Sequence, residues 1–216
     1  MPFESVEILQ FAAGSYPRSA PRTGLMVLFP GFGYGPDKPL LHYARKSALA
    51  AGWQTLAIDY GPLSRTPGDS VFEASRAAFP QAFSAACAQV DSALRAGEYA
   101  RILFVSKSFG TLIAGELTAS RPAIGAENFF LTPLGDTLPY LGQPGCMAAT
   151  GGADGLVTAP QRRAMRELLG SRLLLFPGAD HSLEVAGDPL AGIEILSQVT
   201  AALCRMLGIP IGARGC

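Results

Sequence analysis

The segment Ser106-Lys-Ser-Phe-Gly110 carries residue types and spacing suited to nucleophilic chemistry. It follows the apolar run 101–105 and precedes a helical run that begins at Thr111, as expected of a strand that turns sharply into a helix. Such a turn presents its central side chain, and it requires small residues two positions before and after. The segment therefore predicts that Ser108 is a nucleophile. A serine in an ordinary strand-to-helix loop is the alternative.

A serine hydroxyl needs a base, and histidine is the usual one near neutral pH. The chain has two histidines. His42 lies inside a predicted helix, whereas His181 lies in Gly178-Ala-Asp-His-Ser182, between the last predicted strand and the last predicted helix. His181 is therefore the predicted general base.

The third member of such a site is a carboxylate that orients the imidazole. Asp154 lies in the glycine-rich loop 151–157, after the strand that precedes the His181 strand. This position makes the chain order serine, aspartate, histidine. Asp136, one strand earlier, is the alternative acid, and Asp180 is interpreted as a turn residue.

Acyl transfer also needs hydrogen-bond donors for the oxygen that becomes negative in the transition state. The backbone N–H of Phe109, at the start of the helix after Ser108, is one predicted donor. The loop Phe29-Pro-Gly-Phe-Gly-Tyr-Gly-Pro36 can bring a second N–H close to a ligand. Phe32 is the first choice for this donor and Gly33 the second. A glycine-rich turn with no catalytic role is the alternative.

These residues require a scaffold that gathers the ends of several strands. Short apolar runs alternate with longer helical segments, which predicts an α/β fold with a mostly parallel sheet and helices on both faces. Active groups in such sheets lie beyond the carboxyl ends of the strands. Pro80 is expected to break or kink its helix. The strands are expected at 25–29, 54–58, 101–105, 128–131, 146–149 and 172–176, with a strand-like run at 3–11, and the helices at 39–51, 71–96, 111–120, 160–169 and 189–207.

With these motifs the chain resembles a small member of the α/β-hydrolase superfamily, of the dienelactone-hydrolase-like or carboxylesterase-like type. The resemblance covers nearly all of residues 1–216 and implies one domain without a cap. It implies Ser108, Asp154 and His181 as a catalytic triad, with Phe32 and Phe109 as oxyanion donors. Ser106 departs from the usual glycine of the motif, and Pro30 departs from a histidine found in many relatives.

The composition argues against some classes of binding partner. The 17 basic and 17 acidic residues balance, and the absence of a basic stripe argues against nucleic acid. No apolar run approaches the length of a membrane span, and no signal peptide is evident at Met1, so a cytoplasmic protein is expected. The cysteines at 87, 146, 204 and 216 lack metal-ligand spacing, and the first three are expected in the core. We expect no metal, no cofactor and a small-molecule substrate; the oligomeric state is left open.

Two other classes of function compete with an enzyme of this type. A dinucleotide-binding protein would use Gly31-Phe-Gly-Tyr-Gly-Pro36, with Asp59 on the ribose. Pro36 argues against it, because it replaces the small residue that lets the helix pack on the strand. A non-catalytic binding module on the same fold is the other alternative.

The substrate is less defined by the sequence, because esters, thioesters and lactones share similar tetrahedral intermediates. The loops 60–70 and 132–145 either line an acyl pocket or pack beneath the surface, and their large side chains are Leu63, Leu134, Leu138, Tyr140 and Leu141. Lys107 beside the nucleophile has two interpretations. Its ammonium either reaches the pocket and favours anionic substrates, or turns away and pairs with an acid such as Asp136 or Glu127.

Overall fold

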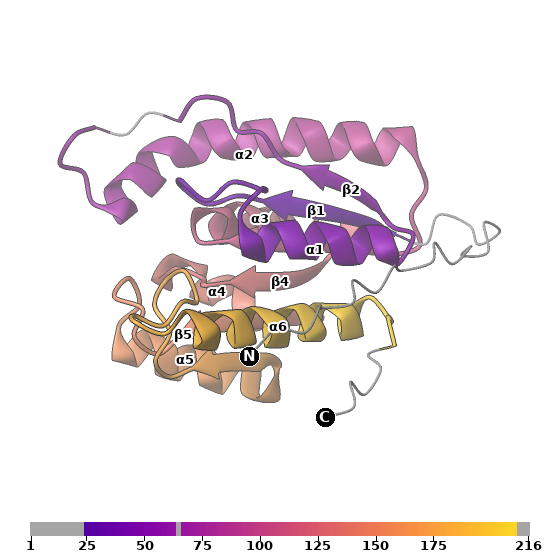
Figure 1. The fold of residues 1–216 in the computed structure, drawn as a ribbon. Coiled ribbons are helices and arrows are strands. Elements are labelled where there is room, and N and C mark those ends of the chain that lie inside the picture. Colours follow the sequence, from indigo (N-terminus) through magenta and orange to yellow (C-terminus); the bar gives the residue numbers. More distant parts are fainter. Residues whose placement is uncertain (1–23, 64–65, 211–216) are drawn as a thin grey trace, which may run out of the picture.

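In a computed structural model, residues 24–63 and 66–210 form a six-stranded parallel sheet with the order β2-β1-β3-β4-β5-β6 (Figure 1). The expected strand at 3–11 lies outside the described residues. All six other predicted strands are present, and each of their ends lies within two residues of the predicted position. The strands are β1 (Leu25–Phe29), β2 (Gln54–Ala57), β3 (Ile102–Lys107), β4 (Glu127–Leu131), β5 (Cys146–Gly151) and β6 (Leu173–Phe176).

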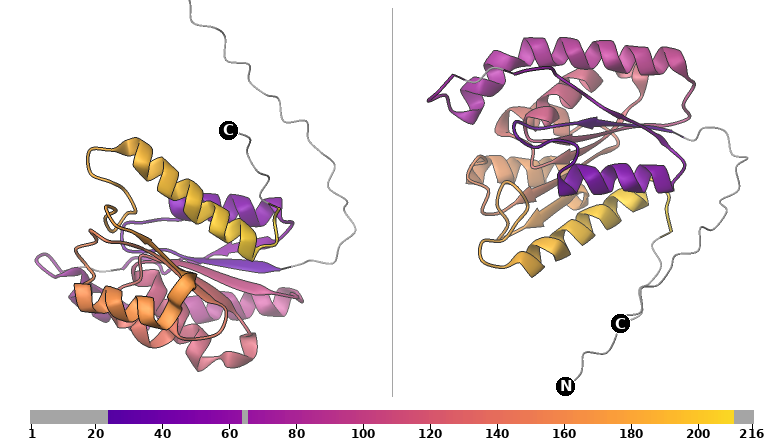
Figure 2. Two further views of the ribbon diagram at one scale, coloured as in Figure 1. Left: turned by 90° about the horizontal axis from the view of Figure 1, so that it is seen from below. Right: turned by 45° about the horizontal axis from the view of Figure 1, so that its top comes forward.

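Helices cover both faces of this sheet (Figure 2). One face is covered by α1 (Pro39–Ala50) and α6 (Pro189–Met206). The other is covered by α2 (Val71–Ala96), α3 (Phe109–Ser120), α4 (Leu138–Leu141) and α5 (Ala159–Leu169). The predicted fold class is thus confirmed. Only the short α4 was not anticipated among these helices.

The central strands are buried on both faces, which explains their unbroken apolar sequences. Every residue of β1 and β3 is buried. Alternate residues of β1 enter opposite cores: Val27 packs on the side of α2 and α3, and Leu28 packs on the side of α1 and α6. Two apolar layers therefore hold the strand ends in register.

Helix α2 runs without a break across Pro80, although its first part is set at an angle to the rest (Figure 1). Of the two effects predicted for Pro80, the structure therefore shows no break, and the angle within α2 agrees with a kink. The helix begins with a capping box, in which Ser70 accepts from the N–H of Glu73 and the Glu73 side chain accepts from that of Ser70.

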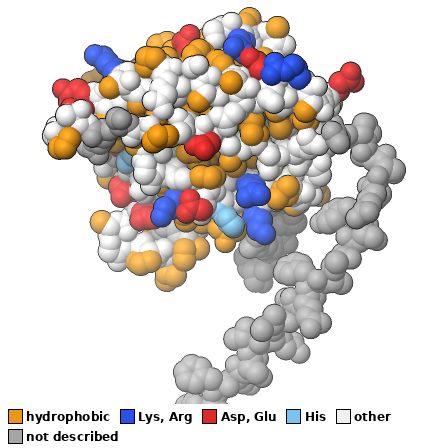
Figure 3. All heavy atoms as spheres, turned by 90° about the horizontal axis from the view of Figure 1, so that it is seen from above, with side chains coloured by type: hydrophobic (Ala, Val, Ile, Leu, Met, Phe, Trp, Pro, Cys, Tyr) orange, Lys and Arg blue, Asp and Glu red, His pale blue; other side chains and the backbone are white. Residues whose placement is uncertain are grey.

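The remaining features of the fold are the cysteine thiols and the surface of the molecule. Cys87 and Cys146 are buried free thiols and Cys204 is partly buried, while Cys216 lies outside the described residues. On the face seen in Figure 3, basic and acidic side chains lie interspersed with apolar ones. Among the described residues, no helix has both the length and the apolar character needed to cross a bilayer.

Candidate active site

Ser108 lies at the sharp turn between β3 and α3, with φ 52° and ψ −118°. This conformation is rare for a residue with a side chain and costs about 1–3 kcal/mol. The N–H of Ser108 donates to the carbonyl of Leu131 on β4 at 3.0 Å, so the sheet holds the turn in place. The predicted elbow is therefore present, and the backbone of Ser108 has the strained conformation expected at such a turn.

The small residue two positions after Ser108 has a clear structural reason. A Cβ atom at Gly110 would overlap the carbonyl oxygen of Phe29, because α3 begins directly against β1. Ser106, two positions before, is fully buried and is accommodated without a glycine. The departure at Ser106 is thus compatible with the elbow.

The structure brings the three predicted triad side chains together. Ser108 Oγ lies 2.8 Å from His181 Nε2, and His181 Nδ1 lies 2.7 Å from Asp154 Oδ2. The carboxylate can only accept, so Nδ1 carries the proton and the neutral ring presents Nε2 as an acceptor to the serine hydroxyl. The hydrogen bonds run continuously from Ser108 to Asp154.

Asp154 is anchored from several directions and is only 2% exposed. Its Oδ1 accepts from the N–H of Leu156 at 2.8 Å. The guanidinium of Arg162 on α5 donates to the carbonyls of Asp154 and Val157. A Cβ atom at Gly151 would overlap the carbonyl of Ala179, so this glycine allows the acid loop and the histidine loop to meet.

The alternative candidates lie elsewhere. Asp136 is exposed, and the hydrogen-bond partner of the His181 Nδ1 atom is Asp154. His42 is exposed on α1, where its ring lies edge-on to Tyr43. Asp180 is a turn residue, because its Oδ1 accepts from the N–H groups of Ser182 and Glu184.

The two residues predicted to supply the oxyanion donors, Phe32 and Phe109, pack against each other. Gly31 and Tyr34 exchange two backbone hydrogen bonds, which closes a turn with Phe32 and Gly33 at its tip. Gly33 has φ 66°, a conformation that glycine adopts readily. The rings of Phe32 and Phe109 pack with centroids 4.6 Å apart. As the first residue of α3, Phe109 has an N–H without an acceptor inside the helix.

Tyr60 supports this arrangement, and sequence reasoning did not identify it. Its hydroxyl donates to the carbonyl of Pro30 at 3.3 Å, and its ring lies edge-on to Phe109 at 5.7 Å. Arg162 and Tyr34 were missed in the same way. No local motif marks Tyr60 or Tyr34, because they contact Pro30, Phe109 and Lys107 across long stretches of sequence. Arg162 acts on residues five and eight positions earlier, but no motif marks it either.

Lys107 follows neither interpretation in full. Its side chain is 1% exposed, so the ammonium does not reach an open pocket. Its Nζ donates to the carbonyl of His181 at 2.8 Å and forms no ion pair with Asp136 or Glu127. Glu127 pairs with Arg101 instead.

The apolar side chains of the loop 132–145 mostly serve packing. Leu134 and Leu141 are completely buried in the core beneath α2 and α3. Leu63, Leu138 and Tyr140 are partly buried against the same core, and the hydroxyl of Tyr140 donates to Glu116 at 2.8 Å. For Leu134 and Leu141, the packing interpretation is the correct one.

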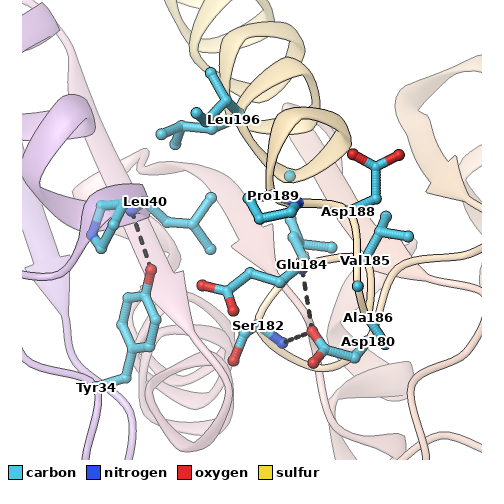
Figure 4. Close-up of a pocket in the computed structure, with 15 residues that line it drawn as sticks. Tyr34, Leu40, Asp180, Ser182, Glu184, Val185, Ala186, Asp188, Pro189 and Leu196 are labelled. Atoms are coloured by element: carbon cyan, nitrogen blue, oxygen red, sulfur yellow. Dashed lines mark hydrogen bonds between the residues drawn. The ribbon is translucent and has the colours of Figure 1, made fainter.

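A pocket of about 480 Å³ opens beside the histidine loop, between the first turns of α1 and α6 (Figure 4). Asp180 and Ser182, the chain neighbours of His181, line it. Its apolar wall includes Leu40 and Leu196, and the Tyr34 hydroxyl accepts from the N–H of Leu40 at 3.0 Å. The charged residues that line the pocket are all acidic: Asp180, Glu184 and Asp188.

Comparison with solved structures identifies the fold. Est1E from Butyrivibrio proteoclasticus superimposes with a TM-score of 0.64 at 13% identity over 89% of this chain and 91% of its own. A serine hydrolase homologue from Coxiella burnetii gives 0.61 at 14% over 85% and 84%. A lidless α/β serine hydrolase from Xanthomonas campestris gives 0.56 at 17% over 93% and 88%. The chain therefore has the α/β-hydrolase fold. No protein-family model and no curated protein matches it.

Proposed function

We propose that the protein is a serine hydrolase that cleaves a small ester-type substrate, a carboxylester, thioester or lactone, through an acyl-enzyme on Ser108. The observation that carries the proposal is the unbroken hydrogen-bond chain from Ser108 through His181 to Asp154. The strained elbow adds support, because strain of this kind gathers at active sites. The fold shared with solved serine hydrolases agrees with it.

In the acylation step, Ser108 Oγ attacks the carbonyl carbon while its proton passes to His181 Nε2. The carbonyl π pair moves to oxygen, and the N–H groups of Phe32 and Phe109 stabilise the resulting oxyanion. Asp154 stabilises the imidazolium through Nδ1–H. Collapse of the intermediate breaks the bond to the leaving group, which receives the proton from Nε2.

Deacylation repeats these steps with water. His181 takes a proton from the water, the new oxygen bonds to the acyl carbon, and Ser108 departs with the proton that Nε2 returns. The free acid leaves and the enzyme is restored. The residues of this chain supply every proton transfer in this scheme.

The pocket beside His181 is the proposed binding place for part of the substrate, since it begins at the neighbours of the base. Its size suits a small organic group, and its wall combines apolar and polar side chains. Its three carboxylates favour a neutral or cationic group over an anionic one.

The proposal is tested by labelling with a fluorophosphonate, which reacts with activated serines. We expect stoichiometric labelling at Ser108, identified by peptide mass spectrometry, and no labelling of Ser108→Ala. A folded parent protein that resists the reagent and does not hydrolyse activated esters or thioesters would instead support a binding module.

A further inference from the structure

Lys107 combines a position next to the nucleophile with a fully buried ammonium group. The side chains of β3 alternate between the two cores, and Lys107 shares its face with Val105, toward α1 and α6. The lysine therefore leaves the strand on the side where the histidine loop and the Tyr34 turn meet. Its position is set by the sheet, since Lys107 pairs with Leu131 of β4.

The partners of this ammonium are unusual for a buried cation. Nζ donates to the main-chain carbonyl of His181 at 2.8 Å and lies 5.0 Å from the centroid of the Tyr34 ring. None of the ion pairs in the described part of the chain includes Lys107. Asp154 and Asp180 act on it only through their fields. The direct contact is therefore with the backbone of the general base.

Keeping an ammonium here opposes folding, because burial disfavours the charged form. Burial lowers the pKa of Lys107 to about 8, even though the Asp154 and Asp180 carboxylates act in the opposite direction. An apolar side chain of similar length would fill the same space without this cost. A perturbed ionisable group beside reacting residues is typical of functional sites.

We propose that Lys107 is a positioning residue, which holds the main chain of His181 so that the imidazole stays between Ser108 and Asp154. The inference rests on the proposed serine hydrolase function. Lys107 links two parts of the site that are 74 residues apart, the end of β3 and the loop that carries the base. One side chain thereby fixes the position of the base relative to the nucleophile.

This role differs from recognition of an anionic substrate. The Tyr34 ring lies against the ammonium, and Lys107 is only 1% exposed. A substrate carboxylate therefore has no direct access to Nζ. Loss of the lysine should slow all substrates equally, whatever their charge.

The kinetic test compares Lys107→Met with the parent and with Lys46→Met, which removes an exposed lysine of α1. Rates are normalised to the serines titrated by a fluorophosphonate, on a neutral ester and a matched ester with a terminal carboxylate. For Lys107→Met we expect kcat to fall about 10- to 100-fold with KM within about twofold, equally on both esters. Lys107→Arg, which keeps a cation and a donor, should recover part of the rate. An unchanged kcat, or a loss confined to the anionic ester, would overturn the proposal.

The pH profile separates positioning from a loss of stability. The Lys107 ammonium lies against the main chain of His181, whose ring is bonded to the Asp154 carboxylate, so removing this cation favours the imidazolium. The acidic limb of kcat/KM should therefore move to higher pH in Lys107→Met and stay in place in Lys46→Met. A limb that does not move in Lys107→Met would indicate a purely structural role.

A measurement without turnover keeps this proposal separate from the proposed function. The chain has two histidines, so the low-field Nδ1 proton of His181, bonded to Asp154, is assigned by NMR with His42→Ala as the reference. We expect this signal in the parent and its broadening or loss in Lys107→Met. An unchanged signal overturns the positioning role, whereas a parent that is inactive but shows the expected change overturns only the hydrolase.

Discussion

The Nδ1 atom of His181 lies 2.7 Å from Oδ2 of Asp154, although 27 residues separate them. The carboxylate side chain has no exposed surface, and its other oxygen accepts from the N–H of Leu156. Because both carboxylate oxygens of Asp154 accept hydrogen bonds and neither reaches water, the Asp154 carboxylate holds the ring proton of His181 on Nδ1. The relation therefore defines the tautomer of the base before any substrate binds.

Replacing the nucleophile gives the most direct prediction. Ser108→Ala should lower kcat on an activated short-chain ester by about 10⁴-fold or more, because no acyl-enzyme can form. Alanine keeps the backbone, so circular dichroism and the melting temperature should stay close to the parent. Turnover within tenfold of the parent would exclude the acyl-enzyme.

Asp154→Asn should slow turnover by about 10⁴-fold, because the amide favours the wrong tautomer of His181. Asp136→Asn is the matched control, since Asp136 is exposed and the hydrogen-bond partner of His181 Nδ1 is Asp154. Steady-state kinetics of the two variants decide the assignment. A larger loss in Asp136→Asn would move the acid to that position.

Because Lys107 is buried, we expect the free energy of unfolding to depend on pH. The pKa of Lys107 is lowered from 10.5 to about 8, so between these pH values the unfolded chain binds more protons than the folded one. The free energy of unfolding of the parent, relative to Lys107→Met, should therefore rise with pH across this window. The full gain is roughly 3 kcal/mol, and below about pH 8 the cost of the charge is fully present.

Urea denaturation between pH 7 and 10.5 measures this difference, with Lys46→Met as the exposed control. The comparison with Lys107→Met cancels ionisation of the tyrosines and cysteines, because both proteins retain them. A difference that stays constant with pH would contradict a buried charged lysine.

Charge selectivity is predicted from the pocket beside His181. Figure 4 shows the Glu184 carboxylate directed toward Tyr34, whose pKa is raised mainly by burial and to a smaller extent by the charge of this carboxylate. Glu184→Gln should therefore raise kcat/KM for an ester with a terminal carboxylate by about two- to fivefold relative to its neutral analogue. Added salt should shrink the difference.

The control for this experiment is Glu98→Gln, which removes an exposed acid that precedes the N-terminal end of β3, whereas His181 follows the carboxyl end of β6. It changes the net charge by the same amount and should leave the ratio of the two esters unaltered. An equal effect of both substitutions would assign the preference to overall charge rather than to the pocket.

Ser108, Asp154 and His181 could be proposed from the sequence because each follows an apolar run that reads as a buried strand. The carboxyl ends of parallel strands converge at one edge of the sheet, so residues there are close whatever the details of packing. The strands, both helical layers and the elbow follow from the same local patterns. The acid remained ambiguous between Asp154 and Asp136, since two neighbouring strands offered the same placement.

Only the tertiary structure decided the directions of side chains that act across the fold. In the structure the ammonium of Lys107 donates to the carbonyl of His181, and the hydroxyl of Tyr60 donates to the carbonyl of Pro30. Leu134 and Leu141 are buried in the core. Spacing along a strand indicates which face of the sheet a residue occupies, but these contacts also depend on which distant segments pack against that face. The sequence by itself determined the fold class and the candidate triad, and packing at the strand ends determined how that triad is held.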